Sequence, residues 1–285
     1  MFADDPVYER RRRRDKIARG LCLAATAVAI LPLLAVLLYV AQKGLSGLSW
    51  EFFTEMPNPV GEPGGGLKHA FAGTLITVGI ASAIGIPIGI MAGIYLSEFG
   101  DNRLGTAVRF CADVMAGVPS ITVGIFVYTL VVVTMQHFSA LAGGIALAII
   151  MLPTVTRTTE EMLRLVPASL REAALALGAP KRRAIVRIAL RTAAPGIATG
   201  VMLAVARVAG ETAPLLFTAL GNQYWSTALD KPIATLPVQL YNYAVSPYDD
   251  WHEKAWAAAL VLVFGVLVLN VLARALVANR GGSRS

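Results

Sequence analysis

Long apolar runs alternate with short polar segments along this chain. A helix needs about 20 apolar residues to cross the hydrocarbon core of a bilayer. Runs of about this length cover residues 21–42, 70–96, 110–135, 139–155, 195–220 and 256–277. The pattern therefore predicts an all-α protein, a polytopic membrane helical bundle with six transmembrane helices.

The polar segments divide the chain into parts. Residues 1–20 form a basic tail, and residues 21–68 hold the first apolar run with the segment after it. Residues 69–277 are the expected core of the bundle, with residues 156–194 as its longest connection, and residues 278–285 form a second tail. The composition supports a membrane protein, because 56% of the residues are hydrophobic and only 15% are charged.

Small residues recur at every fourth position of the second run. They are Gly73, Thr77, Ala81, Gly85, Gly89 and Gly93. Small residues on one face let two helix backbones approach closely in lipid. We therefore expect this helix to pack at the centre of the bundle, unless the spacing is chance in a chain with 26 glycines. In the third run, Pro119 is expected to kink the helix.

Lysine and arginine favour alternate polar segments. If the N-terminus is cytoplasmic, the cytoplasmic segments hold 20 of the 25 lysines and arginines, and the external segments hold four. This bias is typical of the positive-inside rule, so both termini are expected in the cytoplasm. The net charge of +7 then reports membrane topology and is poor evidence for nucleic-acid binding.

Two charged residues, Arg207 and Glu211, interrupt the fifth run. An ionised side chain at mid-bilayer costs roughly 2.5–3.5 kcal/mol on insertion scales, so it usually faces a protein interior or a water-filled path. On a continuous helix a spacing of four places both residues on one face. They either form a structural ion pair or line a path for a solute, and the two roles are compatible.

The connection at residues 156–194 carries clear helix signals. Ser169 and Glu172 fit a capping box at a helix start. Gly178, followed by Pro180, is typical of a helix end with the glycine in the left-handed conformation. Between them, apolar residues repeat with a helical period at Leu170, Ala173, Ala174 and Leu177. Such a short helix suits docking on a partner or lying on lipid headgroups, and a second, basic amphipathic helix follows it.

The same connection resembles the EAA motif of ABC-importer permeases. The matching positions are Glu172, Ala173, Ala174, Gly178, Ile188 and Leu190, and Arg191 stands where the general motif has proline. The resemblance implies a type I importer permease fold over residues 69–277. It also implies that Glu172, Ala173, Ala174 and Gly178 belong to a coupling helix that docks on a separate ATP-hydrolysing subunit.

A narrower resemblance, to the permease subunits of bacterial phosphate importers, covers nearly the whole chain. It rests on residues 48–53, 117–121, 152–160 and 206–217. It implies a non-catalytic, multi-pass subunit of the bacterial inner membrane. The implied partners are a second permease subunit, an ATPase dimer, a periplasmic phosphate-binding protein, phosphate and membrane lipid. The implied residues of the translocation path are Arg207, Glu211, Arg157 and Thr212.

The chemistry of these residues is compatible with phosphate transport. A guanidinium matches a phosphate oxyanion with paired donors, so we expect Arg207 to bind the anion transiently and Glu211 to compensate its charge otherwise. The chain has no phosphate-cradling Gly-x-x-x-x-Gly-Lys-Ser/Thr loop, so ATP hydrolysis is expected in a partner. No cofactor or metal motif is apparent. The alternatives are a permease for another oxyanion such as sulfate or molybdate, a membrane enzyme that uses Glu211, and a passive channel.

Overall fold

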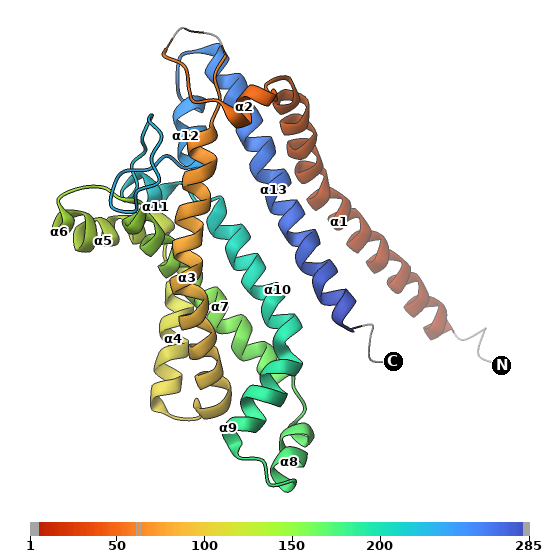
Figure 1. Cartoon of the computed structure of the whole chain (residues 1–285). Helices are drawn as coiled ribbons and strands as arrows, with labels where there is room; N and C mark the ends of the chain where they lie inside the picture. The colour runs from red at the N-terminus through yellow and green to blue at the C-terminus, as the bar shows by residue number, and fades with distance from the viewer. Residues whose placement is uncertain (1–5, 61, 63, 282–285) are drawn as a thin grey trace.

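The computed structural model describes residues 6–60, 62 and 64–281, and it is a bundle of helices (Figure 1). The α-helices are α1 (Pro6–Ser46), α2 (Trp50–Thr54), α3 (Lys68–Phe99), α4 (Arg103–Gly117), α5 (Ser120–Val127), α6 (Val133–Met135), α7 (Ala140–Arg164), α8 (Ala168–Ala176), α9 (Lys181–Arg183), α10 (Leu190–Ala209), α11 (Ala213–Leu216), α12 (Leu236–Ala244) and α13 (Asp249–Gly281). Two π-helical turns, Tyr128–Val132 and Ala184–Ala189, join α5 to α6 and α9 to α10. The predicted fold class is confirmed.

Membrane-spanning helices make up most of the described residues. Five are long and apolar enough to cross a bilayer: Arg10–Ser46, Lys68–Phe99, Ala140–Arg164, Lys181–Ala209 and Asp249–Leu272. A sixth span results if the bent pair Arg103–Gly117 and Ser120–Met135 is counted as one. The predicted tails at residues 1–20 and 278–285 lie partly outside the described residues, and their described parts continue α1 and α13.

The third predicted helix is broken, not merely kinked. Its two halves meet at an angle of 105° at Val118 and Pro119. Val118 has extended dihedral angles (φ −70°, ψ 131°), and Pro119 follows with φ −57° and ψ 134°. Proline disfavours helical angles at the residue before it and has no N–H to continue the helix. The sequence located this site correctly and underestimated the bend.

The fifth predicted helix, residues 195–220, is displaced along the chain. The helix begins at Lys181 and ends at Ala209, with Gly210 as its C-cap. Residues beyond it form only the short α11, where Pro214 occupies the first turn. A glycine cap followed by a proline ends a helix locally, even though the apolar run continues. The prediction that one helix carries both Arg207 and Glu211 is therefore wrong.

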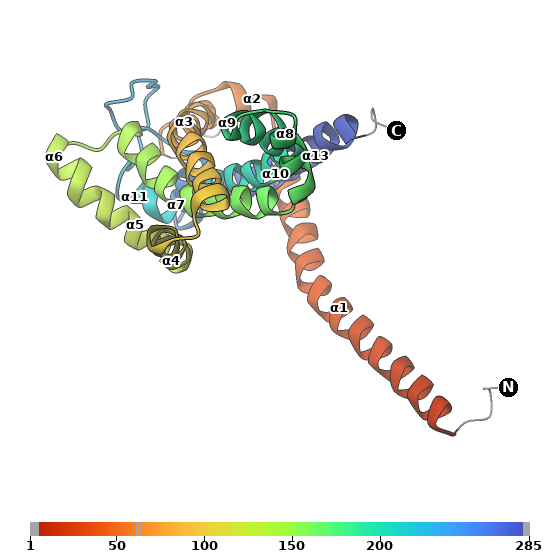
Figure 2. The same cartoon turned by 90° about the horizontal axis from the view of Figure 1, so that it is seen from below.

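The contact between α3 and α7 forms the centre of the bundle (Figures 1 and 2). Every member of the predicted small-residue series in α3 is buried. A Cβ atom added at Gly89 would lie 2.8 Å from Val155 Cβ, and one at Gly93 would lie 2.5 Å from Thr159 Cβ. The missing side chains thus let the two backbones approach, and the predicted central position of this helix is confirmed.

Helix α1 leaves the bundle along most of its length (Figure 2). Its last turns pack on α13, where the Tyr39 and Trp256 rings lie 5.2 Å apart edge to face. The apolar membrane segment of α1 is otherwise uncovered within the described chain. This helix therefore offers a long surface to lipid or to another subunit.

Candidate functional site

Arg207 lies in the last turn of α10, and its side chain is 52% exposed. Its Nε atom is 3.9 Å from Oε1 of Glu211, which is an ion pair but too long for a hydrogen bond. Glu211 is 18% exposed and follows the helix end at Gly210. Gly210 N donates to Arg207 O and Glu211 N donates to Val208 O, both at 3.2 Å, and this turn keeps the two charges near each other. Among the described residues the Arg207 side chain donates no hydrogen bond, so its guanidinium remains available to a ligand.

A cavity of about 350 Å³ opens beside Arg207. Its other lining residues come from the α4–α5 break and from α7: Met115, Ala116, Val118, Ser120, Thr122, Val123, Phe126, Ile149 and Ile150. Arg207 is the charged member of this lining, and the hydroxyl groups of Ser120 and Thr122 are the other polar side chains. A single cation on an apolar wall attracts an anion more strongly than it would in water, because the apolar wall screens little.

Thr212 lies at the start of α11, next to Glu211. Its backbone carbonyl accepts hydrogen bonds from Leu215 N at 3.1 Å and Leu216 N at 3.2 Å. Helix α11 in turn packs on α5, where Gly124 lies against Pro214. Neither Thr212 nor Glu211 is among the residues that line the cavity. Of the predicted path residues, Arg207 is thus the one on the cavity wall.

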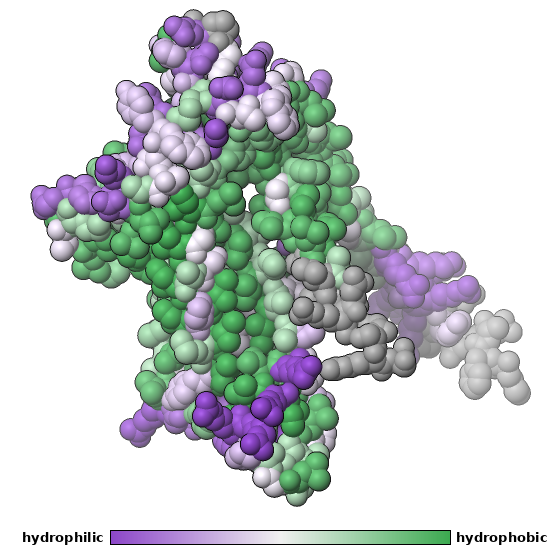
Figure 3. All heavy atoms as spheres, in the orientation of Figure 1, coloured by the Kyte–Doolittle hydropathy of each residue, from purple (hydrophilic) through white to green (hydrophobic). Residues whose placement is uncertain are grey.

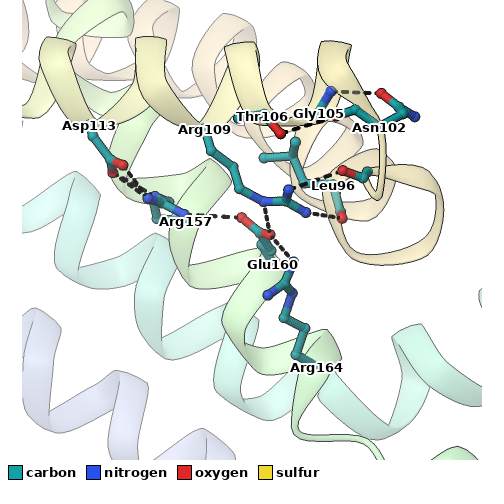
Figure 4. A network of polar contacts seen from close by, with 10 residues as sticks. Leu96, Asn102, Gly105, Thr106, Arg109, Asp113, Arg157, Glu160 and Arg164 are labelled. Carbon is teal, nitrogen blue, oxygen red and sulfur yellow. Dashed lines mark hydrogen bonds and ion pairs between the residues drawn. The ribbon is translucent and has the colours of Figure 1, made fainter.

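Arg157 belongs to a charge network in the C-terminal part of α7 (Figure 4). It lies inside this helix, which extends to Arg164, and not after it as expected. Its guanidinium binds both carboxylate oxygens of Asp113 in α4, with Nε donating to Oδ1 at 2.8 Å. It also donates to Glu160 Oε2 at 3.4 Å. Arg157 is therefore already paired with carboxylates in this structure.

Glu160 is the centre of the network and was missed by sequence reasoning. Its side chain is 2% exposed, and Oε1 lies 2.7 Å from Arg109 Nε and 2.8 Å from Arg164 Nη2. Arg109 also donates to the carbonyls of Leu96 at 2.8 Å and Gly100 at 3.0 Å, at the end of α3. The network thus ties α3, α4 and α7 together. A sequence signal existed, since Arg164 follows Glu160 by four residues on the same helix.

The predicted start of helix α8 is wrong by two residues. The helix begins at Ala168 with Pro167 as N-cap, and no side chain caps it. Ser169 therefore lies within the first turn and cannot act in a capping box. Pro167 has φ −54°, and its carbonyl accepts a hydrogen bond from Leu170 N at 3.2 Å. Its ring sets the dihedral angle for the helix entry without help from a hydroxyl group.

The predicted end of α8 is confirmed. Gly178 has φ +77°, in the left-handed region. Gly178 N donates to Leu175 O at 2.9 Å, and Ala179 N donates to Ala174 O at 3.1 Å. These two bonds form a Schellman motif, which satisfies the last carbonyls of the helix.

Most of the apolar face of α8 is uncovered. Ala174 is buried, whereas Glu172 and Ala173 are exposed and Leu177 is 88% exposed. The base of the helix is nevertheless held by Arg171, whose Nη2 lies 2.8 Å from Glu98 Oε1 in α3 and donates to Leu163 O in α7 at 2.8 Å.

A second attachment lies just after α8, where the Lys181 ammonium is 4.4 Å from the centre of the Phe99 ring at the end of α3. Helix α8 is thus held to the bundle by these two contacts, while its apolar end at Leu177 is exposed. No group of three or more His, Cys, Asp and Glu that could hold a metal occurs among the described residues.

Comparison with known proteins adds a family to this geometry. The family model described as "Binding-protein-dependent transport system inner membrane component" matches residues 85–280. The "Phosphate transport system permease protein PstA" of Yersinia pestis is 50% identical over 95% of this chain and 92% of its own length. The "Phosphate transport system permease protein PstA 1" of Mycobacterium tuberculosis strain H37Rv is 39% identical over 94% of this chain and 89% of its own length.

Solved structures share the fold at low sequence identity. A bacterial alginate ABC transporter chain has a TM-score of 0.64 at 13% identity and is matched over 93% of this chain and 94% of that chain. A chain of the MetNI methionine ABC transporter has a TM-score of 0.60 at 17% identity, over 75% of this chain and 93% of that chain. These likenesses concern the helical architecture alone.

Proposed function

Since this chain belongs to the family of binding-protein-dependent transport system inner membrane components, and within it to the PstA phosphate transport permeases, we propose that it is the membrane subunit through which an ATP-driven importer carries inorganic phosphate across a bacterial inner membrane. The relatives match it over nearly its full length. Permeases of ABC importers work with an ATPase and a substrate-binding protein.

The specific partners follow from the family. They are a second permease of the PstC kind, an ATPase dimer of the PstB kind and a periplasmic phosphate receptor of the PstS kind. ATP hydrolysis then takes place in the ATPase, and this chain has no catalytic role of its own. The excess of lysine and arginine on alternate segments supports cytoplasmic termini and a cytoplasmic position for α8.

The cavity beside Arg207 carries the proposal for the substrate path. An arginine that is half exposed on an apolar wall, with a carboxylate 3.9 Å away, is charged and only loosely paired. A phosphate oxyanion entering the cavity can take two guanidinium donors at once and displace the weak contact with Glu211. When the anion leaves, Glu211 again compensates the cation, which lowers the cost of an unpaired charge in the membrane.

Arg157, which pairs with Asp113 in α4, offers a second position for the anion. Its partner Asp113 lies two residues before Met115, which lines the Arg207 cavity. The bidentate Asp113 carboxylate occupies the donors that a phosphate would need. We therefore place Arg157 on the path only in a state in which Asp113 has released it. Thr212 follows Glu211 and precedes α11, so we propose that it lies on the path together with Glu211.

The long helix from Lys181 to Ala209 connects coupling to the substrate path. It has 29 residues, so it spans about 43 Å at about 1.5 Å per residue. Its first residues adjoin α8, and its last turn carries Arg207. Movement of α8 by an ATPase would be passed to this helix and, through Arg171, to α3 and α7. A single helix, Lys181–Ala209, thus links α8 to Arg207 at the cavity.

ATP hydrolysis by the purified four-part complex in lipid vesicles tests this function. The receptor is supplied loaded with phosphate or with sulfate, and an unloaded receptor is the control. We expect phosphate-loaded receptor alone to stimulate hydrolysis. Stimulation by sulfate, or by neither anion, would remove the phosphate assignment, because a guanidinium by itself binds either oxyanion.

A further inference from the structure

Four exposed arginines on the first turns of the α9–α10 helix have no protein partner among the described residues. They are Arg182, Arg183, Arg187 and Arg191. Five other basic side chains at this end of the molecule do have partners. Arg109, Arg157, Arg164 and Arg171 pair with carboxylates, and Lys181 lies over the Phe99 ring. The same end of the molecule therefore has paired cations next to these four unpaired arginines.

The free arginines line two adjoining surface grooves. One has a volume of about 400 Å³ and is lined by Pro180, Arg182, Arg183, Val186 and Arg187. The other has a volume of about 490 Å³ and is lined by Val186, Arg187, Leu190, Arg191 and Ala194. Val186 and Arg187 belong to both, so the grooves form one strip along the helix, and we call it the arginine strip.

The packing of the opposite helix face keeps the arginine strip on the outside of the bundle. On the opposite face of the same turns, Ala184, Ile185, Ala189 and Ala193 are buried. The strip also coincides with the π-helical turn Ala184–Ala189. Such turns are rare and are frequently found at functional sites. No carboxylate belongs to the lining of either groove, so the positive charge of the strip is uncompensated.

The lining of the strip becomes richer in apolar residues in the direction of the membrane. The first groove has three arginines and Val186, whereas the second has Arg187 and Arg191 together with the apolar side chains of Val186, Leu190 and Ala194. Both grooves lie on the helix that ends at Ala209. Figure 3 shows hydrophilic atoms gathered at this lower end of the molecule, next to a broad apolar surface. A ligand that fits this order has an anionic group at one end and a hydrocarbon chain at the other.

We propose that the arginine strip is a binding site for an anionic phospholipid, with the headgroup phosphate on Arg183, Arg187 and Arg191 and an acyl chain against Leu190 and Ala194. Basic pockets at the membrane surface are a known means of binding such headgroups. A soluble acidic partner would use the arginines and leave the apolar side chains of Leu190 and Ala194 exposed. The site is separate from the Arg207 cavity, and its assignment does not depend on the transported solute.

The site can be tested by native mass spectrometry of the delipidated importer complex, titrated with phosphatidylglycerol or phosphatidylcholine. The variant R183Q/R187Q/R191Q is compared with R11Q/R12Q/R13Q, which removes the same charge from the exposed start of α1. We expect tight phosphatidylglycerol binding by the wild type, at least about tenfold weaker binding by the strip variant, and near wild-type binding by the α1 variant. Equal loss in both variants would mean general charge attraction and would overturn the proposal.

Two further measurements separate the other ligands. Inorganic phosphate is added as a competitor, and it should not displace phosphatidylglycerol if the acyl chain contributes. Displacement by phosphate would make the strip a free-anion site. If the strip variant instead loses the ATPase subunit while phosphatidylglycerol binding is unchanged, the arginines serve that protein. The single variant R187Q, which touches both grooves, keeps the test valid if the triple variant does not assemble, and we expect about fivefold weaker lipid binding.

Discussion

Glu160 and Arg207 both carry a charge inside a membrane-spanning helix, and their surroundings are opposite. Glu160 is 2% exposed and is contacted by Arg109, Arg157 and Arg164. Arg207 is 52% exposed, lies 3.9 Å from one carboxylate and faces a cavity. The Glu160 carboxylate is enclosed by arginines whose contacts hold three helices together, whereas the Arg207 guanidinium is only partly paired. A charge whose donors are not all used by the protein can exchange partners, and a transport site requires that.

The largest expected effect is on stability, at the enclosed charge. Glu160→Gln should destabilise the folded bundle by about 3–5 kcal/mol, because it removes the buried carboxylate that pairs with three arginines and leaves the partly buried Arg109 without its counter-charge. The measurement is the amount of folded protein after purification and its unfolding temperature. Asp15→Asn is the matched control, since the Asp15–Arg19 pair is exposed and surface pairs contribute little. An equally small effect of both variants would contradict the distinction between the two regions.

The next largest effect is expected on transport, at the partly paired Arg207. Arg207→Gln should reduce phosphate uptake at least about tenfold, because a hydrogen bond to a charged group contributes about 1.5–3 kcal/mol. The complex should still assemble, since Arg207 stabilises little in the fold. Uptake of radioactive phosphate by vesicles, normalised to assembled complex, is the measurement. Arg207→Lys retains the charge without the paired donors and should give an intermediate rate. Unchanged uptake by Arg207→Gln would end its assignment to the path.

The α3–α7 contact provides a third comparison within one helix. Gly93→Ala should destabilise the bundle by about 1–3 kcal/mol, because the new Cβ would lie 2.7 Å from the Thr156 carbonyl and 2.5 Å from Thr159 Cβ. Gly79→Ala in the same helix meets nothing within 4 Å and serves as the control. Unfolding temperatures of the two variants in detergent give the difference. If both are equally stable, the glycine spacing does not set the approach of the two helices.

The end of α8 tests coupling separately from transport chemistry. Gly178→Val places a β-branched residue at φ +77°, so the Schellman motif should be lost at a cost of about 1–2 kcal/mol. No atom lies within 4 Å of the added Cβ, so the effect would come from the backbone alone. We expect loss of phosphate-stimulated ATP hydrolysis with the membrane helices intact. Gly178→Asn, which tolerates this conformation, should restore most of it; normal coupling by Gly178→Val would mean that docking occurs elsewhere.

The smallest expected effect concerns Asp113. Asp113→Asn removes the charge that holds Arg157, while the contact of Arg157 with Glu160 at 3.4 Å remains. If Arg157 receives the anion, phosphate should stay there longer and the maximal uptake rate should fall about two- to fivefold, equivalent to about 0.5–1 kcal/mol. The amount of assembled complex should change less than in Glu160→Gln. A normal uptake rate would restrict Arg157 to a structural role.

Local signals in the sequence determined much of this structure correctly. The apolar runs predicted the approximate positions of most spans, because a membrane helix depends on the hydrophobicity of its own residues. The third span is nevertheless broken, and the fifth is displaced. The small-residue series in α3 predicted close packing, and Gly178 predicted the end of α8. Each of these signals lies within a single helix, so it can be recognised without reference to the rest of the fold.

Only the tertiary structure decided which charges are enclosed and which are open. Arg109 and Glu160 are 51 positions apart, and Arg157 and Asp113 are 44 apart, so no local pattern pairs them. The cavity at Arg207 exists because the chain turns by 105° at Pro119 and brings α5 beside α11. Hydrophobicity along the chain sets which residues enter the membrane, whereas the exposure of a charge depends on which distant helix packs against it.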